Sequence, residues 1–285
     1  MKKILLLLSG LVWGVSLHAG IIRVVAAENF YGDVALMLGQ PYVQVTSVLM
    51  NPASDPHLYS PTPDVAKAVE NADIVIENGL GYDVWMDDLY ASSSQKAMMI
   101  NVGSVLEVPM GHNPHIWYSP VTMPVFAKAF TAKLIMLDPA DTSVYQKNLA
   151  YVLQRATLLQ FQVDKTRKQV SGMRITVTEP IFNDMAHALD LKILNDPFAW
   201  EMMNGANISP RDIAAFQQSL NTKAVSLLIY NNQVTDPTTS QLKALAIKNG
   251  IPVIGVSELM PPSQHYYQWM QDTLAQVSVS LGAVK

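Results

Sequence analysis

The feature that most limits the fold of this chain is an alternation of strand and helix patterns, interrupted once by a long helical stretch. Short runs rich in Val and Ile alternate with segments of helical spacing before residue 138, and the alternation resumes after residue 172. Such alternation predicts parallel sheets flanked by helices, here with about four strands on each side of the interruption. Residues 138–170 contain no glycine, which predicts one helix about 45 Å long.

The expected fold class is therefore α/β, with two lobes joined by one long rigid helix and a cleft between the lobes. We divide the chain into a signal peptide over residues 1–19, an N-terminal lobe over 20–138, a linker helix over 139–171 and a C-terminal lobe over 172–285. Four helix starts are predicted where a capping side chain precedes proline: Thr62-Pro63, Ser119-Pro120, Ser209-Pro210 and Asp236-Pro237.

The N-terminal segment is typical of a cleaved signal peptide. Lys2 and Lys3 precede an apolar run, and the small residues Ala19 and Gly20 suit a signal-peptidase cut. The uninterrupted apolar run is short for a membrane span. The sequence contains no cysteine, so we expect no lipid anchor on cysteine and a protein free in a bacterial periplasm.

Composition excludes several classes of function. The 285 residues are 49% hydrophobic, which is enough to form a real core, and the net charge is −4 with no basic stripe. Nucleic acid is therefore not an expected partner. The absence of cysteine excludes disulfide scaffolds, thiolate zinc sites and cysteine nucleophiles, so any metal ligands must be nitrogen or oxygen atoms.

Four side chains of the type that binds metals lie just beyond predicted strands. His57 and His115 follow the second and fourth strands of the first lobe, while Glu179 and Glu258 follow the first and last strands of the second lobe. Ligands of open parallel sheets bind beyond the carboxyl ends of the strands, so the four residues are expected to converge if the lobes face each other. Two imidazoles and two carboxylates suit Zn²⁺, Mn²⁺ or Fe²⁺.

Each of these residues also has an ordinary interpretation. A loop histidine is often only solvated, Glu179 suits the positive end of the helix that follows it, and Glu258 alone resembles a surface acid. Only their shared position in the topology favours a metal site. Gly79-Leu80-Gly81 is interpreted as a turn, because the third glycine of a dinucleotide-binding loop is absent.

In combination, several motifs resemble the zinc/manganese solute-binding proteins of ABC importers, called cluster A-I. The motifs are AAENFYGD at 26–33, DPH at 55–57, SPTP at 60–63, NGLGY at 78–82 with Trp85, NPHIW at 113–117, TEPIF at 178–182, IYNNQV at 229–234, and VSE at 256–258 followed by Pro261-Pro262. The resemblance covers nearly the whole chain after the signal peptide. It implies two lobes joined by a rigid helix, and a metal bound between them and handed to a membrane permease.

Carried over residue by residue, the resemblance implies His57 and His115 as the two histidine ligands, Glu179 as the third ligand and Glu258 as the fourth. The chain departs from many zinc-dedicated members, because residues 102–113 contain no His- and acid-rich loop and no acid lies at 207–209. These departures leave manganese, or broad divalent binding, open beside zinc.

The expected function is a periplasmic receptor that captures Zn²⁺ or Mn²⁺ and delivers it to the permease of an ABC importer, acting as a monomer. A filled site of four protein ligands leaves little room for a catalytic water, so we do not expect an enzyme. The alternatives are a periplasmic metallohydrolase that uses the same site between the lobes, and a metal-binding adhesin.

Overall fold

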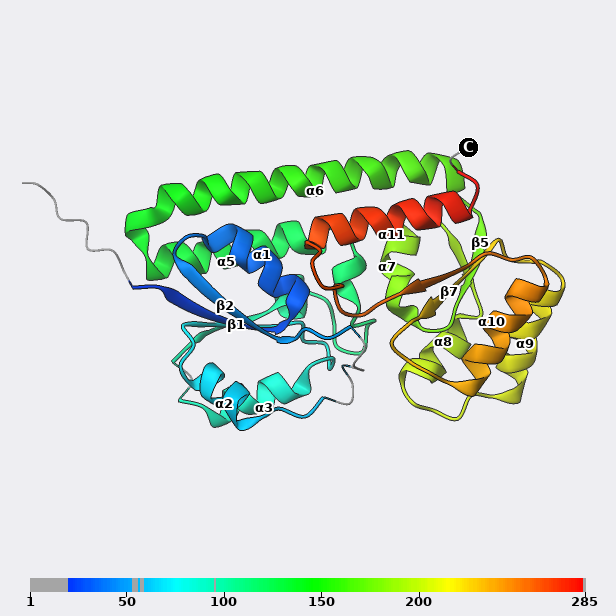
Figure 1. Ribbon diagram of the computed structural model, residues 1–285, viewed down its shortest axis with the longest axis horizontal. Coiled ribbons are helices and arrows are strands. Elements are labelled where there is room, and N and C mark those ends of the chain that lie inside the picture. The colour runs from blue at the N-terminus through cyan, green and yellow to red at the C-terminus, as the bar shows by residue number, and fades with distance from the viewer. Residues whose placement is uncertain (1–19, 53–55, 57–58, 95, 284–285) are drawn as a thin grey trace, which may run out of the picture.

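The computed structural model describes residues 20–52, 56, 59–94 and 96–283, which form two α/β lobes side by side along one long helix (Figure 1). The predicted signal peptide and His57 lie outside the described residues. The strands of the first lobe are β1 (Ile22–Glu28), β2 (Val43–Leu49), β3 (Ile74–Glu77) and β4 (Met98–Asn101). Its helices are α1 (Asn29–Gly39), α2 (Pro63–Glu70), α3 (Val84–Ser92), α4 (Val102–Val105) and α5 (Thr122–Leu137), with a 3₁₀ turn at Ile116–Tyr118.

The second lobe repeats this plan. Its strands are β5 (Arg174–Val177), β6 (Lys192–Leu194), β7 (Leu227–Asn231) and β8 (Val253–Val256), and its helices are α7 (Asn183–Ala188), α8 (Asp196–Met203), α9 (Pro210–Asn221), α10 (Pro237–Lys248) and α11 (Tyr266–Ser280). Both sheets are parallel, with the orders β2-β1-β3-β4 and β6-β5-β7-β8. The strand order reverses between β1 and β3 and between β5 and β7, and such reversals are the usual ligand-binding points of open sheets.

Each sheet is covered on both faces because successive side chains of a strand point to opposite sides. In β1, Val24 and Ala26 join the large core formed with α1 and α5, whereas Val25 and Ala27 pack against the helices of the opposite face. Figure 1 shows α1 and α5 on one side of this sheet and α2 and α3 on the other. The hydrophobic runs in the sequence are therefore explained by burial of both faces.

The predicted long helix is confirmed. Helix α6 (Thr142–Val170) has 29 residues and follows a 3₁₀ turn at Pro139–Asp141. Ser171 is its C-cap, and Gly172 adopts a left-handed conformation with φ +76°. Its buried residues recur at helical spacing, and the helix runs along both lobes beside α11 (Figure 1). Among the described helices, none is both long and apolar enough to cross a bilayer.

Three of the four predicted helix starts are confirmed. The side chains of Thr62, Ser209 and Asp236 accept hydrogen bonds from backbone N–H groups of the first turns of α2, α9 and α10. The prediction at Ser119 was wrong: its N–H closes the 3₁₀ turn by donating to the Ile116 carbonyl (3.0 Å), and α5 begins only at Thr122.

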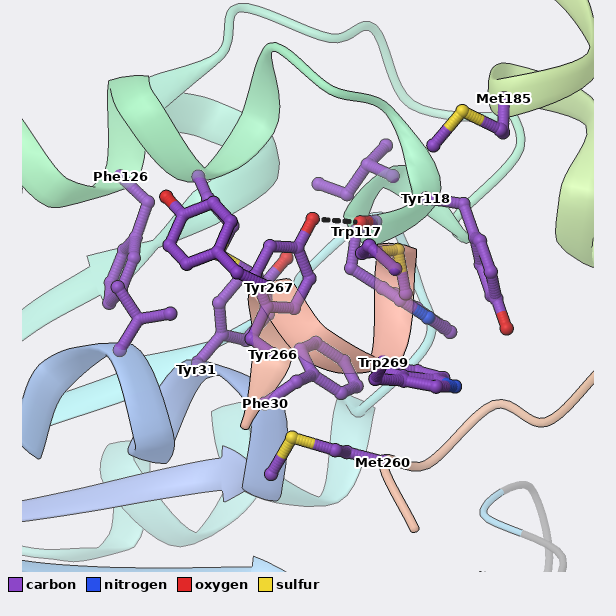
Figure 2. Close-up of a cluster of buried hydrophobic side chains, with 14 of the residues drawn as sticks. Phe30, Tyr31, Trp117, Tyr118, Phe126, Met185, Met260, Tyr266, Tyr267 and Trp269 are labelled. Atoms are coloured by element: carbon purple, nitrogen blue, oxygen red, sulfur yellow. Dashed lines mark hydrogen bonds between the residues drawn. The ribbon is translucent and has the colours of Figure 1, made fainter. Parts of the chain in front are cut away.

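One core connects the lobes. Figure 2 shows a buried aromatic cluster in which Phe30 of α1, Trp117 of the 3₁₀ turn and Trp269 of α11 lie together. The rings of Phe30 and Trp117 are stacked, with 4.7 Å between their centroids. The Tyr266 hydroxyl donates to the Trp117 carbonyl oxygen (2.7 Å), which fixes α11 to the segment that carries His115.

Candidate metal site

Two of the predicted ligands meet at the carboxyl end of the second sheet. Glu179 lies two residues beyond β5 and is 6% exposed, and Glu258 lies two residues beyond β8 and is fully buried. Asn231, the last residue of β7, lies between them. Its Nδ2 atom donates to Glu179 Oε2 (2.8 Å) and to Glu258 Oε1 (2.7 Å), so one amide group holds both carboxylates.

The first lobe contributes His115, which is fully buried in the loop before the 3₁₀ turn. Its Nδ1 atom lies 2.7 Å from Asn113 Oδ1, an oxygen that can only accept, so Nδ1 carries a proton and, in the neutral ring, Nε2 carries the lone pair. Nε2 lies 3.8 Å from Glu258 Oε2. That separation is below the roughly 4.2 Å that two atoms can span when both bind the same metal ion at about 2.1 Å.

Asn113 also fixes the loop of His115 to the second lobe. Its Nδ2 donates to the Pro180 carbonyl oxygen (2.7 Å), next to Glu179. The same side chain therefore selects the metal-binding tautomer of the histidine and joins the two lobes at the site. Such outer partners orient ligands in many metal proteins.

Tyr82 supplies a further contact from the first lobe. The residues of the predicted turn, Gly79, Leu80 and Gly81, all have positive φ, and Tyr82 N–H closes the turn by donating to Gly79 O (3.1 Å). This turn aims the Tyr82 hydroxyl at Glu258 Oε2, to which it donates at 2.9 Å. Burial, followed by the charge of Glu258, raises the Tyr82 pKa well above its usual value, so the phenol remains a neutral donor.

The segment that carries Glu258 is also held by the first lobe. The Asn29 side chain donates to Met260 O (2.7 Å) and accepts from Met260 N–H (3.1 Å), and the Tyr118 hydroxyl donates to Ser257 O (2.9 Å). Glu258 therefore follows a strand of the second lobe while its loop is fixed to the first. The site is a true junction of the two lobes.

The structure thus brings together His115, Glu179 and Glu258, while the position predicted for His57 lies outside the described residues. Within the described part of the chain, no three His, Asp or Glu side chains already form a metal shell. The Asn231 amide lies between the two carboxylates. Sequence reasoning missed Asn231, Tyr82 and Asn113 as parts of the site, although all three lie in the motifs of the resemblance.

A second group of acids is buried in the first lobe beside this site. Glu28 ends β1, Glu77 ends β3 and Asp83 precedes α3, and each of them is at most 1% exposed. Asp83 accepts from the N–H groups of Asn78 (2.6 Å) and Gly79 (2.8 Å). In the described part of the chain, no N–H or hydroxyl group donates to either Glu28 oxygen.

These environments raise the pKa of all three acids. Burial, followed by the charge of Asp83, raises the Glu28 pKa well above its usual value. Burial raises the pKa of Asp83 to about 6, and burial together with the charge of Asp83 raises that of Glu77 to about 8. Glu28 therefore keeps its proton to higher pH than a solvent-exposed glutamate does.

Comparison with known proteins identifies the family. Residues 24–279 match the family model described as zinc-uptake complex component A periplasmic, ZnuA. The chain is 25% identical over 248 residues to the metal ABC transporter substrate-binding lipoprotein SloC of Streptococcus mutans, covering 81% of this chain and 79% of that protein. It is 24% identical over 279 residues to the manganese ABC transporter substrate-binding lipoprotein PsaA of Streptococcus pneumoniae, covering 91% and 89%.

Solved structures share the fold. A crystal structure of ZnuA has a TM-score of 0.75 at 18% identity, covering 91% of this chain and 98% of that one. The periplasmic zinc-binding protein TroA of Treponema pallidum has a TM-score of 0.74 at 16% identity, covering 92% and 99%. An Mn-bound periplasmic metal-binding protein of Candidatus Liberibacter asiaticus has a TM-score of 0.73 at 20% identity, covering 91% and 99%.

The family match decides between the functions expected from the sequence. SloC and PsaA are by name substrate-binding components of metal ABC transporters, and neither name describes a hydrolase. Both are called lipoproteins, whereas this sequence contains no cysteine. The chain belongs to the ZnuA family of periplasmic zinc-uptake components, whose members are substrate-binding receptors of ABC importers and not enzymes.

Proposed function

We propose that this chain captures one divalent metal ion, Zn²⁺ or Mn²⁺, at His57, His115, Glu179 and Glu258 and delivers it to the permease of an ABC importer. The observation that carries the proposal is the buried approach of His115 Nε2 to Glu258 Oε2 at 3.8 Å, with Glu179 held to the same Glu258 through one amide. We further propose that the chain acts as a monomer in the periplasm after removal of residues 1–19.

The donor set suits a transition metal as cargo. A neutral imidazole offers one lone pair, and two buried carboxylates offer negative charge that a divalent cation neutralises. Zn²⁺ generally binds nitrogen and oxygen donors more tightly than Mn²⁺, so affinity alone does not name the transported metal. The names of the relatives support both metals, since manganese stands in that of PsaA and zinc in that of TroA.

The proposal predicts that His115→Ala and Glu179→Ala each weaken metal binding by at least about 100-fold, because loss of a direct ligand costs more than loss of an outer partner. Competition titrations against a fluorescent chelator, with Zn²⁺ and Mn²⁺ separately, measure the effect on the mature protein. His187→Ala is the matched control, since His187 is exposed on α7. Wild-type affinity in both ligand variants would contradict the assigned site.

A further inference from the structure

We infer that Asn231 is the positioning residue of this metal site: its amide donors orient Glu179 and Glu258 before the metal arrives. The inference rests on the function proposed above and concerns a residue outside the proposed set of ligands. Asn231 is 2% exposed, and it ends the central strand β7, between β5 and β8, which precede the two carboxylates.

The orientation of the Asn231 amide follows from its third contact. Its Oδ1 atom accepts from the backbone N–H of Gln233 at 2.9 Å. A backbone N–H can only donate, so this contact must be made by the amide oxygen, and the NH₂ group must face the carboxylates. Both amide hydrogens are then used, one for Glu179 and one for Glu258.

The hydrogen bond that Asn231 donates to Glu258 distinguishes between the two oxygens of that carboxylate. Asn231 binds Oε1, whereas Oε2 faces His115 Nε2 at 3.8 Å. The amide therefore holds the oxygen that points away from the histidine and leaves the other directed toward it. Ligating carboxylates in metal proteins are commonly oriented by hydrogen bonds of this kind.

The Asn231 amide also stabilises the metal-free state, in which the two buried carboxylates have no metal ion to neutralise them. Two buried carboxylates close to one another repel, and burial penalises each charge unless hydrogen bonds compensate it. Asn231 provides one charge-assisted bond to each carboxylate. Its backbone is fixed as well, because Asn231 pairs with Val256 and its N–H donates to Thr178 Oγ1 (3.3 Å). The donors are thus held on the sheet and not on a loop.

Asn231→Ala and Asn231→Leu test this role, since both remove the donors and leucine keeps a side chain of similar size. We expect each variant to bind Zn²⁺ and Mn²⁺ about 10- to 100-fold more weakly, the range found when outer partners of metal ligands are removed. The stoichiometry is expected to stay at one metal per chain. X-ray absorption on the zinc-loaded protein is expected to show the wild-type number of nitrogen and oxygen ligands, whereas Glu179→Ala loses an oxygen ligand.

Asn232→Ala is the matched control, because the adjacent Asn232 is exposed. Wild-type affinity in Asn231→Leu would overturn the inference, as would a lost metal ligand in either Asn231 variant, which would make Asn231 a direct ligand. If His115→Ala and Glu179→Ala weaken binding while both Asn231 variants bind as wild type, only this inference fails. A wild-type protein that binds neither metal overturns the proposed function as well.

Discussion

A thousandfold excess of Zn²⁺ or Mn²⁺ over its Kd is expected to raise the free energy of unfolding of the mature protein by about 4 kcal/mol. The metal binds only the folded chain, because the ligands come from distant parts of the sequence and meet only at the junction of the lobes. For a domain of this size the gain corresponds to a rise in Tm of about 8–16 °C. Calorimetric or circular-dichroism melts before and after addition of metal, and again after addition of a chelator, measure it.

The rise in Tm is expected to be seen as a single unfolding transition of the whole protein. His115 belongs to the first lobe and Glu179 to the second, and one hydrophobic core runs through both lobes and α11. Metal binding therefore stabilises both lobes together. His115→Ala is expected to lose most of the shift. No change in Tm with either metal would show that this site does not bind them, and a full shift in His115→Ala would place the metal elsewhere.

Local sequence patterns predict most of the fold because they depend on neighbouring residues. The helix starts at Thr62, Ser209 and Asp236 follow from one capping oxygen before a proline. The long helix follows from a glycine-free run of helical spacing. Helix α8 was missed because its eight residues lie between a short strand and a polar loop and its N-cap residue, Asn195, makes no capping hydrogen bond with its side chain.

The site could be predicted only in part, for a topological reason. The carboxyl ends of parallel strands all lie at the same end of the sheet. This rule places Glu179 and Glu258 at that end without knowledge of the strand order. The role of Asn231 depends on that order, since β7 must lie between β5 and β8 for one amide to reach both carboxylates. Local sequence does not specify lateral strand order. The assignment of His57 stays a prediction.

Replacing Glu28 by glutamine is expected to stabilise the protein above pH 5 and to have little effect near pH 4.5. Burial and the neighbouring Asp83 raise the pKa of Glu28 in the folded protein well above its usual value. In the unfolded chain the pKa of this residue is about 4.3. Between these two values the folded state binds one more proton than the unfolded state. The free energy of unfolding therefore falls as pH rises, by up to about 1.4 kcal/mol per pH unit for this group.

The Glu28→Gln substitution removes this pH dependence of the free energy of unfolding and keeps a hydrogen-bonding group beside Asp83. The glutamine amide is neutral at every pH, and an amide N–H can donate to the neighbouring Asp83 carboxylate as a protonated Glu28 carboxyl would. Urea unfolding of metal-free wild type and Glu28→Gln at pH 4.5, 6.0 and 7.5 measures the difference, which is expected to grow with pH. Glu107→Gln, the same change at an exposed residue, is the control. Parallel pH profiles for wild type and Glu28→Gln would mean that Glu28 ionises in the folded protein as it does in the unfolded chain, and the buried acids would then hold a further negative charge beside that of Asp83.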